Sequence, residues 1–79
     1  MMRQTNHGRI GQLFFNQRIF MPDIRFRNGA VWGGLQVGTY FEVLNDNRMW
    51  VSTRLMSTDY NYYLQGVCNY VPEGAFVRI

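Results

Sequence analysis

Apolar and polar residues alternate along most of this chain in short runs. In the segment MWVSTRL, Val51, Thr53 and Leu55 fall on one side of an extended strand, because successive side chains point to opposite faces. Trp50 and Arg54 fall on the other side with a serine between them. No window places apolar residues at helical spacing over three turns. The pattern therefore predicts strands and no helix.

Eight short strands are expected, separated by glycine, proline and other turn-forming residues. The segments are rich in aromatic and β-branched residues, which suit a pleated and half-buried surface. The expected strands cover residues 9–15, 17–20, 24–27, 30–35, 39–44, 49–55, 61–66 and 75–79.

Four turns are expected between these strands. Residues 21–23 (MPD) fit a turn because proline fixes its own φ and disfavours helix at the residue before it. Residues 27–30 (RNGA) contain Asn-Gly, the strongest short hairpin signal, which predicts a type I′ turn. Residues 45–48 (NDNR) and 57–59 (STD) are rich in Asn, Asp and Ser, which favour turns, and predict two further turns.

The short strands and the Gly33-Gly34 pair together predict a fold class. The two glycines interrupt an apolar run, where they favour a bulge or a sharp bend. We expect a single small all-β domain over residues 1–79, with residues 1–8 as a polar N-terminal arm. The strongly twisted antiparallel sheet should close into an SH3-like or OB-like barrel, and an open meander with an edge pair is the alternative.

The alternation also assigns core positions. Phe41 and Val43 should be buried if Glu42 between them faces water, and Tyr40 should then be partly exposed. The pattern leaves open which face of the Trp50 strand is buried, because the large ring lies beside polar neighbours.

Cysteine content and hydropathy bear on the cellular setting. Cys68 is the only cysteine, so no intrachain disulfide can form, and small extracellular domains usually depend on disulfides. The chain lacks a signal-peptide pattern at its N-terminus and has no apolar run long enough to span a membrane. We expect a cytoplasmic protein that does not contact a membrane.

Few residues suit catalysis or metal binding. The single histidine, His7, lies in the polar N-terminal segment, and Cys68 is flanked by apolar residues typical of a buried position. One cysteine and one histidine cannot supply a structural zinc site, and the five acidic residues are scattered. We therefore expect no enzyme activity, no metal and no cofactor.

Arginine and aromatic residues give the clearest binding signal. All eight basic residues are arginine, and the net charge is +3. Arg25 and Arg27 should share one face of a strand with Phe26 on the core side. Such a face suits a protein interface, where Trp, Tyr and Arg are enriched, or single-stranded nucleic acid, where guanidinium groups meet phosphates and rings stack on bases. A solvated arginine face with no partner is the remaining alternative. The candidate binding residues are Arg25, Arg27, Arg48, Trp50, Arg54, Tyr60, Tyr62 and Tyr63.

The segment GGLQVGTYFEVLNDNRMWVSTRLMSTDYNYYLQG and the closing GAFVRI resemble DUF5348, a family of small bacterial proteins of unknown function. The segment GRIGQLFFN is similar to the opening strand of that family. Members of the family tend to occur in plasmid-borne or mobile contexts, and the family implies no activity. The matching positions are Leu35, Gly38, Glu42, Val43, Trp50, Thr53, Arg54, Tyr63, Leu64 and Gly66.

These observations lead to three functional hypotheses. The first is a non-enzymatic protein that binds another protein, as an accessory or inhibitor encoded by a phage or mobile element and acting, for example, on a host defence complex. The second is a β-barrel that binds single-stranded nucleic acid through the arginine and aromatic face. The third is a homodimer formed by edge-strand pairing.

Overall fold

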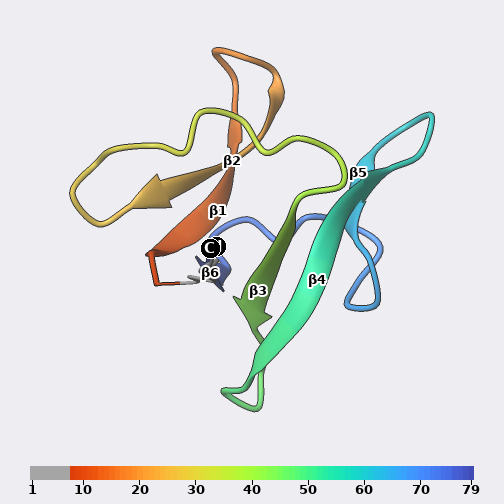
Figure 1. The fold of residues 1–79 in the computed structure, drawn as a ribbon. Helices are drawn as coiled ribbons and strands as arrows, with labels where there is room; N and C mark the ends of the chain where they lie inside the picture. Colours follow the sequence, from red (N-terminus) through yellow and green to blue (C-terminus); the bar gives the residue numbers. More distant parts are fainter. Residues whose placement is uncertain (1–7) are drawn as a thin grey trace, which may run out of the picture.

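Six strands form one antiparallel sheet in the computed structural model, which describes residues 8–79 (Figure 1). Along the sheet the order is β2-β1-β6-β3-β4-β5, and no helix occurs among the described residues. The all-β expectation is therefore confirmed. The strands are β1 (Ile10–Asn16), β2 (Met21–Phe26), β3 (Tyr40–Leu44), β4 (Trp50–Ser57), β5 (Tyr62–Leu64) and β6 (Phe76–Arg78).

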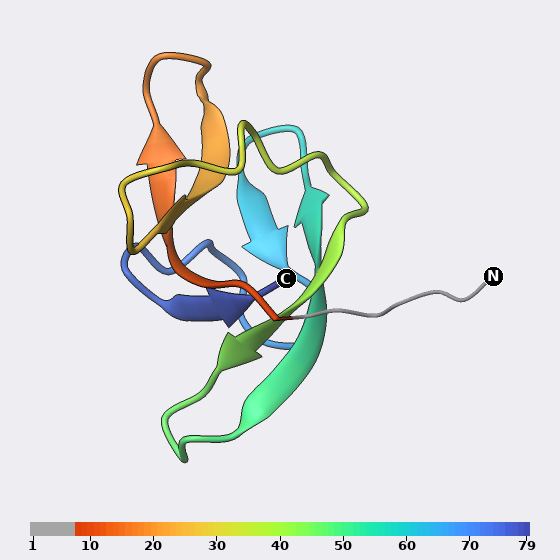
Figure 2. The ribbon, with the colours of Figure 1, turned by 60° about the vertical axis from the view of Figure 1, so that its left-hand side comes forward.

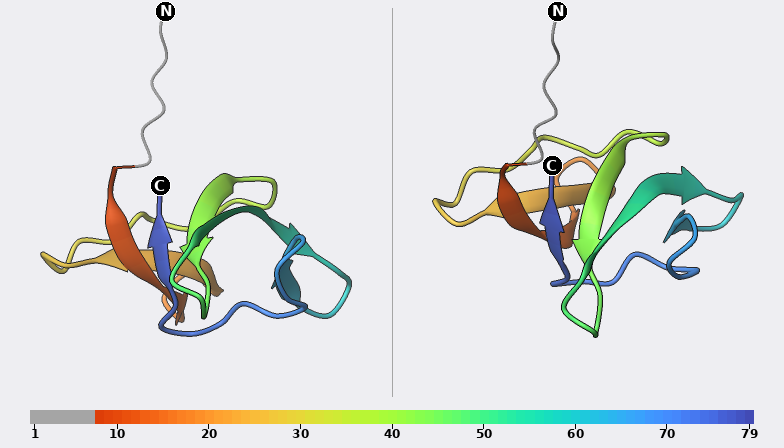
Figure 3. Two further views of the ribbon diagram at one scale, coloured as in Figure 1. Left: turned by 90° about the horizontal axis from the view of Figure 1, so that it is seen from below. Right: turned by 60° about the horizontal axis from the view of Figure 1, so that its bottom comes forward.

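The last strand joins the two halves of the sheet. Strand β6 lies between β1 and β3, so the C-terminal segment pairs with two hairpins that are distant in sequence (Figure 3). Next to these ladders, Arg9 and Ile79 exchange backbone hydrogen bonds of 3.1 and 2.9 Å. The two ends of the described chain therefore lie side by side.

Strand β4 pairs with a different neighbour along each half of its length. Its first half, Trp50–Arg54, pairs with β3, and its second half, from Leu55 to Ser57, pairs with the three-residue strand β5. The change of partner along one strand lets the sheet curl strongly, as Figure 2 shows.

The expected closure into an SH3-like or OB-like barrel is not observed. The strands at the two ends of the sheet, β2 and β5, do not pair with each other. Segment 30–35 runs along the outer edge of β2, where the amides of Trp32 and Leu35 donate to carbonyls of that strand at 2.9 and 2.8 Å. The outer edge of β5 is occupied by the turn that follows it, because Leu64 and Cys68 form an isolated bridge. Both end strands are covered locally, and the sheet remains open.

The core lies on the concave side of the sheet and receives at least one residue from every strand. Phe41 and Val43 are buried and Tyr40 is 62% exposed, as the alternation predicted. Leu35 reaches the core from the long connection between β2 and β3. The buried apolar residues are Leu13, Ile24, Phe26, Leu35, Phe41, Val43, Leu55, Leu64 and Val77.

Two expected strands and one expected turn were wrong. Residues 17–20 form the turn between β1 and β2, where Phe20 has a φ of 59° and its amide donates to the carbonyl of Asn16 at 2.7 Å. Segment 21–23, expected as a turn, is instead the start of β2. Segment 30–35 forms only a bridge at Val31, because Gly33 and Gly34 both have positive φ and bend the chain.

The other turns were placed more accurately. The 27–30 turn exists, but only Gly29 in it has positive φ, so it is not the expected type I′ turn. Its hydrogen bonds, from Gly29 to Phe26 and from Phe26 to Ala30, are those of a three-residue loop with a glycine bulge. The 45–48 turn is confirmed, whereas the third turn lies at 58–61, slightly later than expected.

A buried carboxylate holds the long connection between β2 and β3 in place. Asp23 is fully buried, and its Oδ1 accepts hydrogen bonds from the amides of Gly33 at 2.9 Å and Gly34 at 2.8 Å. Its own neighbour Ile24 donates to the same atom at 2.9 Å, and the side-chain amide of Asn16 donates to Oδ2 at 2.8 Å. One side chain thus ties the bend at the two glycines to the end of the β1–β2 hairpin.

The hydrogen bonds around Asp23 determine its ionisation. Burial by itself would raise the pKa, but the donors from Asn16, Gly34, Ile24 and Gly33 outweigh it and lower the pKa of Asp23 below the ordinary value of 3.8. The side chain is therefore charged at neutral pH, and its charge is met entirely by N–H groups.

Two further expectations concern the N-terminus and membranes. The polar N-terminal arm, apart from Gly8, lies outside the described residues, as does His7. Within residues 8–79 there is no helix of the length and hydropathy needed to cross a bilayer.

Replacement of Asp23 by asparagine should destabilise the fold. The amide cannot accept from all four donors, and loss of hydrogen bonds to a buried charge should lower the free energy of unfolding by about 2 to 3 kcal/mol. Urea denaturation of both proteins at pH 7 measures the difference. Asp46→Asn, in the exposed 45–48 turn, is the matched control and should change stability little.

The same pair of proteins tests the pH dependence. Because the folded pKa of Asp23 is lowered, its stabilisation is present above the ordinary carboxyl pKa and is lost as the pH falls through the folded pKa. The difference between wild type and Asp23→Asn should therefore shrink as the pH is lowered below about 4. A difference that stays constant down to pH 2 would show that the charge of Asp23 does not contribute.

Candidate functional site

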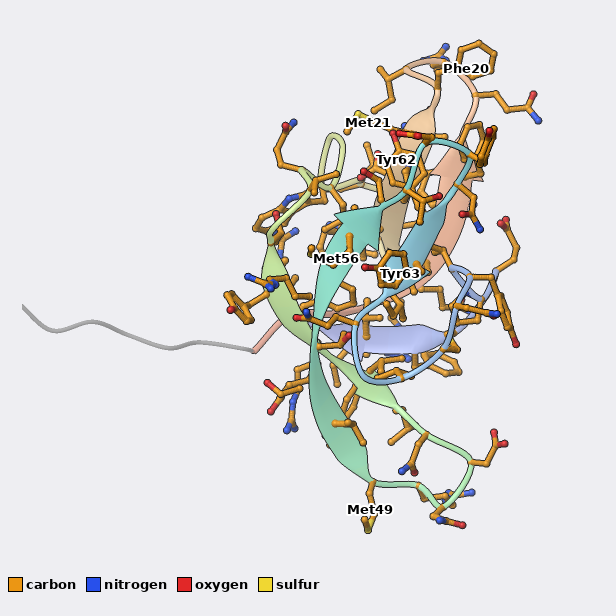
Figure 4. All side chains as sticks on the ribbon, turned by 90° about the vertical axis from the view of Figure 1, so that its right-hand side faces the viewer. Phe20, Met21, Met49, Met56, Tyr62 and Tyr63 are labelled. Carbon is orange, nitrogen blue, oxygen red and sulfur yellow. The ribbon has the colours of Figure 1, made fainter. Side chains whose placement is uncertain are left out.

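The predicted binding residues do not form one surface. Arg25 projects from the outer, convex face of β2, whereas Trp50 and Arg54 project from the same face of β4, with three strands between β2 and β4. Tyr63 on β5 lies beside its partner Met56 on β4, as Figure 4 shows. Tyr60 and Tyr62 instead line a groove between the two ends of the sheet.

On the convex face, arginines stack on aromatic rings of the same sheet. Each guanidinium lies over a ring at a distance typical of cation–π contacts, which are worth about 0.5 to 1 kcal/mol when exposed. The distances from Cζ to the ring centroid are 4.0 Å for Arg25 on Phe14, 5.2 Å for Arg54 on Tyr40 and 4.4 Å for Arg78 on Trp50. The open question about the Trp50 strand is thereby settled, because its ring packs outward, half-buried under Arg78.

Two of these arginines have additional partners. Arg78 Nε lies 2.7 Å from Glu42 Oε1 in an ion pair, and Arg54 Nε donates to Gln65 Oε1 at 3.0 Å. Their guanidinium groups are therefore engaged within the molecule. Arginines and aromatic rings do share the convex face, but the guanidinium groups of Arg25, Arg54 and Arg78 already have partners within the sheet.

Arg25 lies on β2, whereas Arg27 lies in the turn that follows and not on the strand expected for residues 24–27. They line a groove of about 620 Å³ on the outside of β1 and β2, which we call the basic groove. Phe26 between them is buried at 6% exposure, in agreement with the expected core side. The basic groove is lined by Ile10, Gly11, Gln12, Arg25, Phe26, Arg27 and Phe76.

A second groove lies where the sheet fails to close. It is about 430 Å³ in volume, and its walls come from the β1–β2 hairpin on one side and from segments 60–62 and 70–73 on the other. We call it the seam groove. It is lined by Phe14, Phe15, Phe20, Pro22, Tyr60, Asn61, Tyr62, Tyr70, Val71 and Glu73.

The hairpin wall of the seam groove is set by the turn at 17–20. The positive φ of Phe20 places its ring at the end of the hairpin, where Figure 4 shows it above Tyr62. The ring is 76% exposed, and its centroid lies 6.0 Å from that of Phe15. Asn16 holds this turn, because its side-chain Oδ1 accepts from the amide of Arg18 at 3.0 Å while its Nδ2 donates to Asp23.

The opposite wall begins at a turn capped by Thr58. Its hydroxyl oxygen accepts from the amides of Tyr60 and Asn61, both at 3.1 Å, and its hydroxyl donates to Asn61 Oδ1 at 2.9 Å. This local network fixes a turn in which Tyr60 is 94% exposed. Tyr62 follows at the start of β5 and packs partly against the core.

Glu73 joins the two walls. Its Oε1 accepts a hydrogen bond of 3.2 Å from the amide of Phe15, and the following Gly74 donates to the carbonyl of Leu13 at 2.7 Å. Tyr70, three residues earlier, is 57% exposed. The 70–73 segment is thus attached to β1 and places the single carboxylate of the groove against its hairpin wall.

Sequence reasoning missed much of this groove. It identified Tyr60 and Tyr62, but not the phenylalanines of the hairpin or Glu73. The available signal was the pair Phe14-Phe15 followed shortly by Phe20, because adjacent rings on a strand must face opposite sides and one of them cannot reach the core. This signal was missed because residues 17–20 were predicted to be a strand and not a turn that presents Phe20.

The described residues offer no arrangement suited to metal binding. Among residues 8–79, no three His, Cys, Asp or Glu side chains gather closely enough to hold an ion. The thiol of Cys68 is half-buried and donates to the carbonyl of Tyr70 at 3.2 Å.

Comparisons with known proteins identify relatives without a described activity. A family model described as "Domain of unknown function (DUF5348)" matches residues 11–79, which confirms the resemblance seen in the sequence. A crystal structure of a protein from Ruminococcus gnavus, described as a structural-genomics target, is similar with a TM-score of 0.79 and 34% identity over 90% of this chain and 100% of that one. No curated protein matches the chain.

Replacement of Arg48 by glycine should stabilise the protein. Arg48 occupies the turn position with a φ of 64°, where glycine adopts the left-handed conformation without strain from a Cβ atom. We expect a gain of about 0.5 to 1 kcal/mol in the free energy of unfolding, measured by thermal denaturation. Asn47→Gly, one residue earlier and without positive φ, should not stabilise. Equal or lower stability of Arg48→Gly would show that the arginine side chain contributes to the fold.

Proposed function

Because the chain belongs to the DUF5348 family, whose description names no activity, we propose its function from the geometry: it is a non-enzymatic protein that binds another protein through the seam groove. The observation that carries this proposal is that six aromatic residues line one groove in a chain of 79 residues, and that Phe20, Tyr60 and Tyr70 among them are more than half exposed. Exposed aromatic clusters of this kind mark interaction sites, and Tyr is enriched among residues that dominate binding energy.

The exposure of the rings supports this function over a structural one. Phe20, Tyr60 and Tyr70 are each more than half exposed, so they contribute little to the core of the isolated protein. Their burial against a partner would remove a large apolar area from water, at about 25 cal/mol per Å². A protein partner offers complementary side chains for such a surface.

The charge of the groove favours a protein over nucleic acid. Its only charged lining residue is Glu73, which would repel a phosphate backbone. The convex face carries more positive charge, but Arg25, Arg54 and Arg78 lie over rings that a base would need for stacking. Of the predicted binding residues, Tyr60 and Tyr62 belong to the proposed docking site, whereas Arg48, Trp50, Arg54 and Tyr63 lie outside its lining.

Single-stranded nucleic acid is the second candidate, and the basic groove is the observation that favours it. Arg25 and Arg27 line this groove together with Phe76, which is 48% exposed. Neither arginine forms an ion pair with another described residue. Guanidinium groups beside an exposed ring are the elements of a non-specific strand-binding surface.

The third hypothesis, homodimerisation by edge-strand pairing, receives less support from the geometry. The outer edge of β2 is already hydrogen-bonded to segment 30–35, and part of the edge of β5 is bonded to its following turn. Few backbone groups remain for another strand.

A more specific role as an accessory or inhibitor from a phage or mobile element, in the cytoplasm and directed at a host defence complex, remains part of the proposal. Its support is the small size of the chain, its single cysteine and the contexts expected for the family. In this role, the protein bound in the seam groove would be the target of the accessory or inhibitor.

The protein-binding function is tested with a variant that removes two exposed rings. Phe20→Asn with Tyr60→Ala should keep the fold, because asparagine tolerates positive φ and neither ring is buried. Wild type and the double variant are immobilised, and extract of cells that encode the protein is passed over both. We expect the wild-type protein to retain a partner protein in stoichiometric amount. The double variant should retain at least tenfold less of that partner.

Met49→Ala is the matched control for this experiment. Met49 is 57% exposed, and Figure 4 shows it at the opposite end of the molecule from Phe20. The control should retain the partner in full. Equal retention by the double variant would contradict a role for the seam groove.

The nucleic-acid candidate makes a separate prediction. If the seam groove is the functional site, a single-stranded oligonucleotide should bind weakly and only at low salt. The Tyr60→Ala substitution should not change its affinity. Fluorescence anisotropy at 50 and 200 mM salt measures this. Tight binding that survives 200 mM salt and is abolished by Arg25→Ala with Arg27→Ala would favour the basic groove instead.

A further inference from the structure

We propose that the seam groove binds a proline-rich peptide segment in the polyproline II conformation, with a basic side chain of that segment facing Glu73. This inference rests on the proposed protein-binding function and specifies its ligand. It follows from the shape of the groove walls, the unpaired polar groups along them, the state of the strand edges and the charge of the groove.

The walls are made mainly of flat rings. Six aromatic side chains and Pro22 line a groove of about 430 Å³, and Phe15 and Phe20 meet at an interplanar angle of 52°. Phe15 and Phe20 pack against each other and present ring surface to the groove. Proline rings can pack on such surfaces, and aromatic-lined grooves on small domains are a recurring way to hold proline-rich segments.

Polar groups along the groove match a backbone that lacks internal hydrogen bonds. The hydroxyl groups of Tyr60, Tyr62 and Tyr70 make no hydrogen bond to another described residue. A polyproline II helix has no internal hydrogen bonds, so its carbonyl groups are free to accept from these hydroxyls. An α-helix would leave the hydroxyls without such acceptors, because its carbonyls are used internally.

The strand edges argue against binding by strand addition. An added strand needs a row of free amide and carbonyl groups on an exposed edge. The edge of β2 is occupied by hydrogen bonds to Ala30, Trp32 and Leu35, and Leu64 of β5 is bonded in both directions to Cys68. The groove therefore recognises its ligand mainly through side chains.

The charge of the groove specifies a basic residue in the ligand. Glu73 is the only charged residue in the lining, and its Oε1 is directed at the amide of Phe15. Its Oε2 makes no hydrogen bond within residues 8–79 and is available to a ligand. An arginine beside the proline-rich segment would pair with this carboxylate through Oε2 in a charge-assisted hydrogen bond.

The experiment is selection from a displayed library of random twelve-residue peptides against the intact protein. The library favours no conformation in advance. Enriched peptides are then synthesised and titrated into ¹⁵N-labelled protein, which reports where they bind. We expect peptides with closely spaced prolines and a flanking arginine, and the largest shifts at segments 60–62, 70–73 and the β1–β2 hairpin.

Three groove variants and one control connect these peptides to the groove. Tyr60→Ala and Tyr70→Ala should each weaken binding about tenfold, because both rings line the groove and are more than half exposed. Tyr40→Ala is the matched control, since Tyr40 is 62% exposed but lies under Arg54 on the convex face. Glu73→Gln should remove the preference for arginine over alanine in the peptide while leaving the requirement for proline.

The outcomes separate this inference from the proposed function. Groove-dependent peptides without proline would overturn the polyproline inference and leave protein binding through the groove intact. Both the polyproline inference and the proposed protein binding would be overturned if no peptide shifts the resonances of the groove while a single-stranded oligonucleotide does shift resonances of the protein. Proline-rich peptides that bind equally well to Tyr60→Ala and Tyr70→Ala would also overturn the inference.

Discussion

The carboxylate of Asp23 is the interaction on which the rest of the structure depends. It is fully buried, yet it accepts four N–H donors from three separate parts of the chain. Through Gly33 and Gly34 it attaches the long connection to the outer edge of β2, and through Asn16 it supports the turn that presents Phe20. A buried charge is tolerated only when it is paired or hydrogen-bonded in this way. Asp23 therefore supports both the covered edge of β2 and the hairpin wall of the seam groove.

The open sheet explains why the candidate site is a groove. In a closed barrel the first and last strands would pair, and the space between the β1–β2 hairpin and β5 would be filled. Here the end strands are covered by their own loops, so the two ends of the sheet approach without pairing. Aromatic residues from both ends, such as Phe20 and Tyr60, then line the space between them and remain exposed.

The fold could be predicted from sequence as far as local alternation determines it. Period-two patterns located β3 with its buried face and also located β4, because side chains alternate between the two faces of a strand. They did not determine which face of β4 is buried, since Trp50 lies beside polar neighbours. Asp23 was read as part of a turn, because an acidic residue next to proline is common in turns and its distant partners Gly33 and Gly34 cannot be inferred locally. The same limit applies to the groove: Tyr60 and Tyr62 were identified as surface candidates, but their proximity to Phe20 depends on the path of the whole sheet.

Amide hydrogen exchange at Gly33 and Gly34 tests the role of Asp23 most directly. Both amides belong to a segment without regular strand structure, and Gly33 is exposed to solvent. If the buried carboxylate holds this segment, both should exchange as slowly as amides of β1 and β2 near pH 7, and much faster in Asp23→Asn. The contradicting result is that the amides of Gly33 and Gly34 in the wild-type protein exchange as fast as the amide of the exposed turn residue Gly29. The segment would then open independently, and Asp23 would not anchor it.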